Sequence, residues 1–182
     1  MKQESQSSFS ITRTLPAPAE TVYRAWTAFD QLRQWWHPNG AALTGMDNEL
    51  RPGGRIAYHF GGEEGKELFS VEGSYEEVEE GKKLVYTWNW DMHSGIIGKS
   101  AFRLSVSFGE EDGQCRLTVV QDATAEHQNI QVLKTAWEGE LSRLESFLAQ
   151  SSSNQQHSAP HTDGNAAGAG YMELPEQQKV GE

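Results

Sequence analysis

The chain has 182 residues, of which 36% are hydrophobic and 23% are charged, and its formal net charge is −11 at pH 7. A length of this order predicts one domain, and the supply of aromatic and aliphatic side chains excludes a chain that is disordered throughout. The acidic balance disfavours binding to nucleic-acid phosphates and to anionic membrane surfaces, so neither is expected as a partner.

The first elements predicted along the chain are a strand and two short helices. Residues 1–7 are polar, and we expect them to be disordered. Apolar side chains alternate from Phe9 to Leu15, which predicts a strand, and Pro16 ends it. Two helices are then expected from apolar residues at helical spacing: Val22, Trp26 and Phe29, followed by Leu32, Trp35 and Trp36.

After Gly40 the apolar pattern changes to a period of two, which predicts strands with one apolar and one polar face. The apolar sets are Ile56, Tyr58 and Phe60; Phe69, Val71, Gly73 and Tyr75; Leu84, Tyr86, Trp88 and Trp90; Phe102, Leu104, Val106 and Phe108; and Cys115, Leu117 and Val119. Glycine-rich turns separate these sets. Together they indicate an antiparallel sheet that is covered on one side.

The last predicted element is a helix from about Glu126 to Ala149. One stripe of it is apolar: Ile130, Leu133, Trp137, Leu141, Leu144 and Leu148. A helix of that length, roughly 35 Å, could cross the covered face of the sheet. Residues 151–182 are rich in Ser, Gln, His, Ala and Gly and are expected to form a disordered tail, so the folded domain is predicted to span residues 8–150.

Several local motifs sharpen this reading of the fold. They are Pro18–Trp26 (PAETVYRAW), Trp35-Trp36, Leu50–Arg55 (LRPGGR), Leu84–Trp88 (LVYTW) and Trp137-Glu138-Gly139 with Leu144. In this order, over roughly residues 8–149, they resemble the family named after the activator of the 90-kilodalton heat-shock-protein ATPase, in the START-like (SRPBCC) superfamily. The resemblance implies an α+β helix-grip fold, a curved antiparallel sheet wrapped around a long C-terminal helix. Family members commonly have glycine before the helix tryptophan, where this chain has Ala136.

The resemblance and the surplus of aromatic residues predict a protein that binds a hydrophobic or aromatic small molecule between the sheet and the last helix. The expected ligand-binding residues are Trp35, Trp36, Phe60, Phe69, Gly73, Trp88, Trp90, Phe102, Leu133 and Trp137. Plain core packing is the competing interpretation for most of these aromatics. A protein-interaction module, such as a chaperone ATPase-activating cofactor, is the alternative function. An acidic stretch could serve it by docking a basic partner: Glu63, Glu64, Glu67, Glu72, Glu76, Glu77, Glu79 and Glu80.

An enzyme acting in the same cavity, such as a cyclase or hydrolase, is the third hypothesis, but no catalytic constellation supports it. The segment 61–66 (GGEEGK) has the wrong spacing for a phosphate loop and is predicted to be a hairpin turn. Asp91 and His93, with His59 as a distant third ligand, make a poor metal site, and no metal or cofactor is expected. Glu138 is expected to face water beside the apolar stripe rather than a cavity.

Cysteine usage and targeting signals bear on the cellular compartment. Cys115 is the single cysteine, which excludes an internal disulfide framework and a cysteine-clustered zinc site, and its apolar strand predicts a buried, inert thiol. The N-terminal residues lack the apolar core of a signal peptide, and no apolar run is long enough to span a membrane. We therefore expect a cytoplasmic protein.

Overall fold

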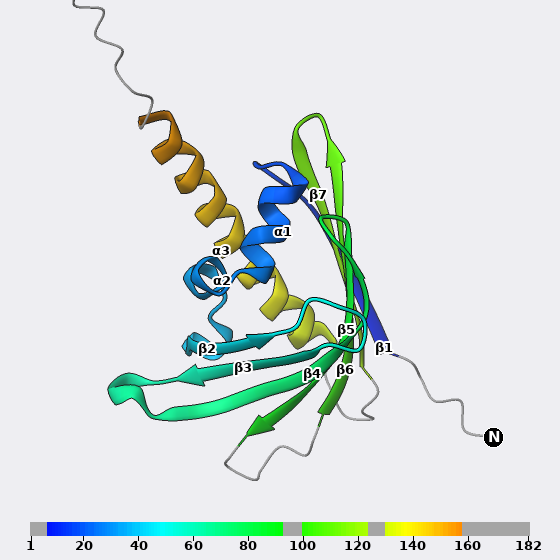
Figure 1. Ribbon diagram of the computed structural model, residues 1–182, viewed down its shortest axis with the longest axis vertical. Helices are drawn as coiled ribbons and strands as arrows, with labels where there is room; N and C mark the ends of the chain where they lie inside the picture. The colour runs from blue at the N-terminus through cyan, green and yellow to red at the C-terminus, as the bar shows by residue number, and fades with distance from the viewer. Residues whose placement is uncertain (1–6, 93–99, 124–129, 158–182) are drawn as a thin grey trace, which may run out of the picture.

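The computed structural model describes residues 7–92, 100–123 and 130–157 (Figure 1). The predicted N-terminal segment before residue 7, His93, and the greater part of the predicted tail lie outside these residues, as does the expected start of the last helix near Glu126.

One antiparallel sheet of seven strands forms the scaffold of the molecule. Its strands are β1 (Ser7–Leu15), β2 (Ala42–Asn48), β3 (Arg55–Gly61), β4 (Glu67–Glu79), β5 (Lys83–Met92), β6 (Ser100–Glu111) and β7 (Gln114–Ala123). Their order in the sheet is β1-β7-β6-β5-β4-β3-β2, so the chain starts at one edge, moves to the other and returns strand by strand. The sheet curves around the helices, which all lie on its concave side (Figure 1).

Helices α1 (Ala19–Thr27) and α2 (Phe29–Trp35) carry the chain from the β1 edge to the β2 edge, and α3 (Ile130–His157) completes the layer. Two short 3-10 turns, η1 (Pro38–Gly40) and η2 (Glu63–Gly65), precede β2 and β4. The predicted α+β helix-grip architecture, with two short helices after the first strand, is therefore confirmed. Strands β3 and β4 flank η2, so the predicted hairpin at residues 61–66 is confirmed as well.

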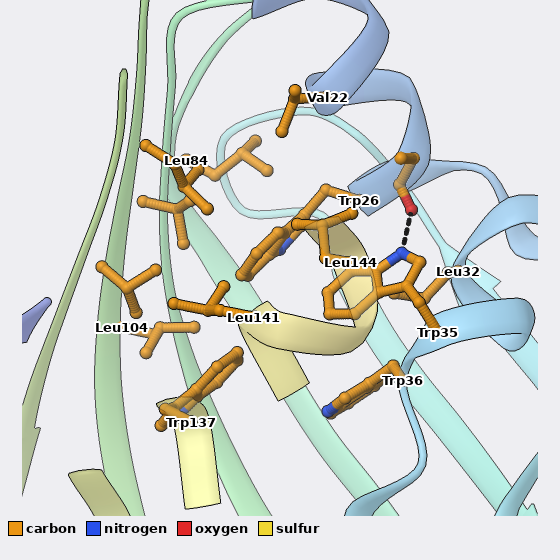
Figure 2. Packing of buried hydrophobic residues seen from close by; sticks show 14 of the residues in the cluster. Val22, Trp26, Leu32, Trp35, Trp36, Leu84, Leu104, Trp137, Leu141 and Leu144 are labelled. Carbon is orange, nitrogen blue, oxygen red and sulfur yellow. Dashed lines mark hydrogen bonds between the residues drawn. The ribbon is translucent and has the colours of Figure 1, made fainter. Parts of the chain in front are cut away.

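The core lies between the sheet and the three helices and contains several tryptophans among its aliphatic side chains (Figure 2). Trp26 of α1 stacks on Trp137 of α3, with ring centroids 5.7 Å apart and planes 4° apart. The Trp35 indole N–H donates to the carbonyl of Ala25 at 2.9 Å, which ties α2 to α1. The later part of the α3 stripe is fully buried, as its spacing predicts: Trp137, Leu141, Leu144 and Leu148.

The structure adds one strand that the sequence pattern did not predict. β2 occupies the edge beside β3, and its register shifts between Leu43 and Gly45. Its residues, ALTGMDN, do not alternate between apolar and polar, because a bulge interrupts the period and only one side of the strand is paired.

The structure also extends the last helix beyond the predicted end near Ala149. α3 continues to His157, because no glycine or proline interrupts residues 150–157. In this extension the hydroxyl of Ser151 donates to the carbonyl of Phe147 at 2.9 Å and that of Ser152 to the carbonyl of Leu148 at 3.1 Å. The final turns of α3 leave the sheet and point outward (Figure 1). Residues 151–157 are thus helical rather than disordered.

Candidate functional site

A pocket of about 430 Å³ opens between the N-terminal half of α3, the segment after α2, and the inner face of the sheet. Its wall consists of Trp36, His37, Pro38, Asn39, Gly40, Trp88, Gln121, Val132, Leu133, Thr135, Ala136, Trp137, Gly139, Glu140 and Arg143. The sheet contributes through β5 and β7, which flank β6. A space of this size is in the range, roughly 300–1,000 Å³, of pockets that hold small organic molecules.

Three indole rings form the aromatic part of the wall. Trp36 and Trp88 stack with ring centroids 5.8 Å apart and planes 27° apart. Trp88 and Trp137 follow at 5.9 Å and 37°. The rings therefore touch one another in sequence from the end of α2 through β5 to α3, and Leu133 adds an aliphatic side chain one turn before Trp137. Such a surface suits a flat apolar molecule.

Gln121 places a buried amide on the sheet side of the pocket wall. The residue is 2% exposed, and its Oε1 accepts a hydrogen bond from Trp137 Nε1 at 2.7 Å. An indole nitrogen only donates, so the amide oxygen must face Trp137. Gln121 thereby fixes both its own orientation and the rotamer of the indole that separates the pocket from the core.

Glu140 supplies a carboxylate at the opposite side of the pocket, where α3 approaches the chain after α2. It is 9% exposed. One oxygen accepts the backbone N–H of His37 at 3.0 Å, and the other accepts Arg143 Nη1 at 2.9 Å. The same Arg143 nitrogen also donates to the carbonyl of His37 at 3.1 Å. The pair therefore clamps residue 37 to α3 and holds the mouth of the pocket in shape.

Between α3 and the sheet, the pocket ends at Trp137. A second, more open pocket of about 500 Å³ lies further along α3, beside α2, and shares His37 and Arg143 with it. Beyond the Trp137 indole, Trp26 fills the space and donates from Nε1 to the hydroxyl of Tyr86 at 3.1 Å. The void that remains there is about 10 Å³, no more than a single water molecule needs. The cavity is consequently confined to one end of the interface between helix and sheet.

The structure places the predicted ligand-binding residues in two groups. Trp36, Trp88, Leu133 and Trp137 line the pocket. Trp35, Phe60, Phe69 and Phe102 are buried in the core and are absent from its wall. Trp90 lies in β5, opposite Val71, and its side chain is outside the described ones.

Gly73 corrects the sequence interpretation. It was expected to be a ligand-binding residue, but a Cβ atom there would overlap the carbonyl oxygen of Thr87 and crowd the backbone of Trp88. Gly73 serves the close approach of β4 to β5 and does not line the pocket. Gly40 and Gly139 are the glycines on the pocket wall, and a Cβ atom at Gly139 of α3 meets nothing within 4 Å.

Sequence reasoning missed the polar residues of the site, although two of them continue patterns that it used. Gln121 extends the alternation of Cys115, Leu117 and Val119 by one more inward position. Glu140 lies three residues after Trp137, on the buried stripe of α3, whereas sequence reasoning considered Glu138 as the acidic residue beside that stripe. Glu138 is half-buried and does not line the pocket.

The other candidate chemical groups do not assemble into a site. Burial, assisted by Glu110, raises the pKa of the Cys115 thiol to about 12, in keeping with an inert buried cysteine. His59 Nδ1 lies 3.7 Å from Glu67. Within the described residues, no group of three or more His, Cys, Asp or Glu side chains could hold a metal ion. The Asp91 side chain and His93 lie outside them.

Three glutamates of the acidic stretch pair with basic side chains of the same sheet. Glu72 pairs with Arg55 at 3.3 Å, Glu76 with Arg103 at 2.7 Å and Glu77 with Lys83 at 2.9 Å. The described glutamates of the stretch are exposed or half-buried, as expected of a solvated face.

None of the helices within the described residues is apolar enough over a sufficient length to cross a membrane.

The curved antiparallel sheet, the α3 helix across it and the pocket between them define a helix-grip protein of the START-like class. A family model described as "Activator of Hsp90 ATPase homolog 1-like protein" matches residues 16–149, and the chain belongs to this family. No curated protein matches the sequence.

Solved structures with the same fold come from several bacteria. An AHSA1-like protein of Aeromonas hydrophila has a TM-score of 0.65 at 23% identity, over 80% of this chain and 94% of that one. A Rhodobacter sphaeroides protein reaches 0.68 at 20% identity, over 82% and 96%. DynU16, from the dynemicin biosynthetic locus, reaches 0.63 at 17% identity, over 78% of this chain and 47% of its own. At these identities the likeness shows the fold alone.

Proposed function

We propose that this protein binds a small, largely apolar or aromatic molecule in the pocket between α3, the segment after α2, and the sheet. The observation that carries the proposal is a space of about 430 Å³ walled by three neighbouring indoles, of which Trp137 closes the inner end and is backed by Trp26. Its few polar groups are held in place by hydrogen bonds, which is the arrangement typical of ligand pockets. The occurrence of DynU16 in a biosynthetic locus agrees with a family that handles small organic molecules.

The chaperone-cofactor alternative has weaker support from the structure. It was motivated by the family name and by the acidic stretch, but the salt bridges of Glu72, Glu76 and Glu77 reduce the negative charge available to a basic partner. Ligand binding explains the pocket, which the alternative leaves without a role.

Native mass spectrometry of the freshly purified protein and titration with a flat apolar probe, 2-ethylnaphthalene, test the proposal together. We expect an added mass that is lost on denaturation, quenching of tryptophan fluorescence by the probe, and a raised melting temperature. Saturation at a hundred times the dissociation constant would add about 2.7 kcal/mol to the free energy of unfolding.

A matched pair of variants locates the binding. Leu133→Trp places an indole in the pocket and should abolish binding, whereas Phe147→Trp adds the same side chain at another half-buried position of α3 and should leave binding unchanged. Far-UV circular dichroism checks that both variants are folded. Equal binding by the two variants would place the ligand elsewhere and contradict the proposal.

A further inference from the structure

The polar groups of the pocket carry information about the ligand. Among the described residues, the buried polar or charged side chains are Ser70, Gln121 and Glu140, and two of these three line the pocket. A polar side chain is rarely buried in an apolar wall without a hydrogen-bonding role. Gln121 and Glu140 therefore bear on the chemistry of the ligand.

Gln121 offers a donor. Its Oε1 is held by the indole N–H of Trp137 at 2.7 Å, and this bond turns the amide nitrogen away from Trp137. No described residue accepts a hydrogen bond from that nitrogen. Gln121 lines the pocket and is 2% exposed, so an acceptor atom of a ligand bound there could satisfy an N–H group of its amide.

Glu140 and Arg143 form a salt bridge and so neutralise each other's charge. The two side chains lie 2.9 Å apart, and both also bind the backbone of His37. The positive charge at the mouth is thus compensated before a ligand arrives. An anionic ligand would approach the Glu140 carboxylate as closely as the Arg143 guanidinium, in a chain whose net charge is −11. The electrostatics of the pocket favour an uncharged ligand.

We propose that Gln121 is the residue that orients the ligand, and that the ligand is an uncharged, flat apolar molecule with an acceptor oxygen, such as a ketone, ester or amide carbonyl, at its buried end. The indoles of Trp36, Trp88 and Trp137 receive the apolar body, and the Gln121 amide donates to the oxygen. This inference rests on the proposed function, because it concerns the same pocket.

Three probes of nearly equal shape separate the contributions: 2-acetylnaphthalene, which has a carbonyl, 2-ethylnaphthalene, which has none, and 2-naphthoate, which is an anion. We expect equilibrium dialysis of the whole chain to give a dissociation constant about tenfold lower for the ketone than for the hydrocarbon, the usual contribution of one hydrogen bond to a buried donor. The carboxylate should bind more weakly than the ketone.

Gln121→Glu replaces the donor by an acceptor while keeping an oxygen for Trp137, and Gln121→Leu removes the amide altogether. Both variants should lose the preference for the ketone and still bind 2-ethylnaphthalene. A variant that still binds 2-ethylnaphthalene has an intact pocket, whereas a variant that fails to fold would lose this binding as well. The matched control is Glu138→Gln, a change on α3 outside the pocket wall, which should keep the tenfold preference.

The outcomes distinguish this inference from the proposed function. If the hydrocarbon and the ketone bind wild-type protein equally well, or if the Gln121 variants keep the preference for the ketone, the role of Gln121 is refuted. The proposed binding of an apolar molecule in the pocket is not affected by either result. Tighter binding of 2-naphthoate would show that Arg143 recognises an anion, which also overturns the inference. If none of the three probes binds, the proposed function fails and the inference fails with it.

Discussion

Replacing Trp137 by alanine should lower the free energy of unfolding by about 3–5 kcal/mol, the usual cost of removing a large aromatic side chain from a core. The indole is 7% exposed and lies between two other tryptophans, stacked on Trp26 at 5.7 Å and tilted against Trp88 at 5.9 Å. Its removal opens a void that joins the neighbouring pocket and deprives Gln121 Oε1 of its donor. Because water can enter from the pocket and reach that oxygen, we expect a value near the lower limit, about 3 kcal/mol.

Urea denaturation followed by far-UV circular dichroism measures this loss without depending on the fluorescence of the deleted indole. Trp137→Phe should cost less, about 1–3 kcal/mol, because it keeps much of the ring contact and loses the hydrogen bond to Gln121. Val132→Ala, at a position of α3 that is 61% exposed, should change stability by no more than about 0.5 kcal/mol. A loss below about 1 kcal/mol for Trp137→Ala, at an unchanged denaturant dependence, would show that α3 does not press this indole into the core.

Further predictions concern two glycines, the C-terminal tail and the thiol. Gly139→Ala should stabilise the protein by about 0.5–1 kcal/mol in the same urea assay, because it adds helix propensity at a position where a Cβ atom meets nothing. Gly73→Ala should destabilise the protein, because its Cβ atom would overlap the neighbouring strand. A loss of stability from Gly139→Ala, or no loss from Gly73→Ala, would contradict the assigned environments. Deleting residues 151–182 should change stability by no more than about 0.5 kcal/mol, since Leu148 is the last buried side chain described in α3; a cooperative loss of several kcal/mol would show that the tail contributes to the fold. Burial raises the pKa of the Cys115 thiol to about 12, so the folded protein should resist a disulfide reagent at pH 8 until it is unfolded. Because the folded thiol keeps its proton, its contribution to the free energy of unfolding is complete below the ordinary pKa of cysteine and declines as pH rises from about 9 to 12. Rapid labelling of the native protein would show that the thiol is accessible.

The alternation of apolar side chains was sufficient to predict most of the sheet and its buried face. Leu84, Tyr86 and Trp88 of β5 are all buried, as their period of two requires. The stripe of α3 likewise predicted the burial of Leu141 and Leu144. These properties follow from local geometry, because successive strand residues face opposite sides and helix residues three or four apart share a face.

Other features depend on residues that are distant in the sequence. The β2 strand exists because β3 offers it a partner, although its own residues carry no alternation. The burial of Glu140 depends on the N–H of His37, which only the packing of α2 against α3 brings within 3.0 Å.

The pocket itself was decided by tertiary packing. Its position depends on Trp26, which fills the inner end of the interface, and on Gln121, which holds Trp137 in place from a neighbouring strand. The sequence predicted that aromatic residues would gather between helix and sheet, but a volume is the difference between the space enclosed by the elements and the side chains that fill it. That difference depends on how far α3 stands from the sheet, and only the assembled structure determines this distance.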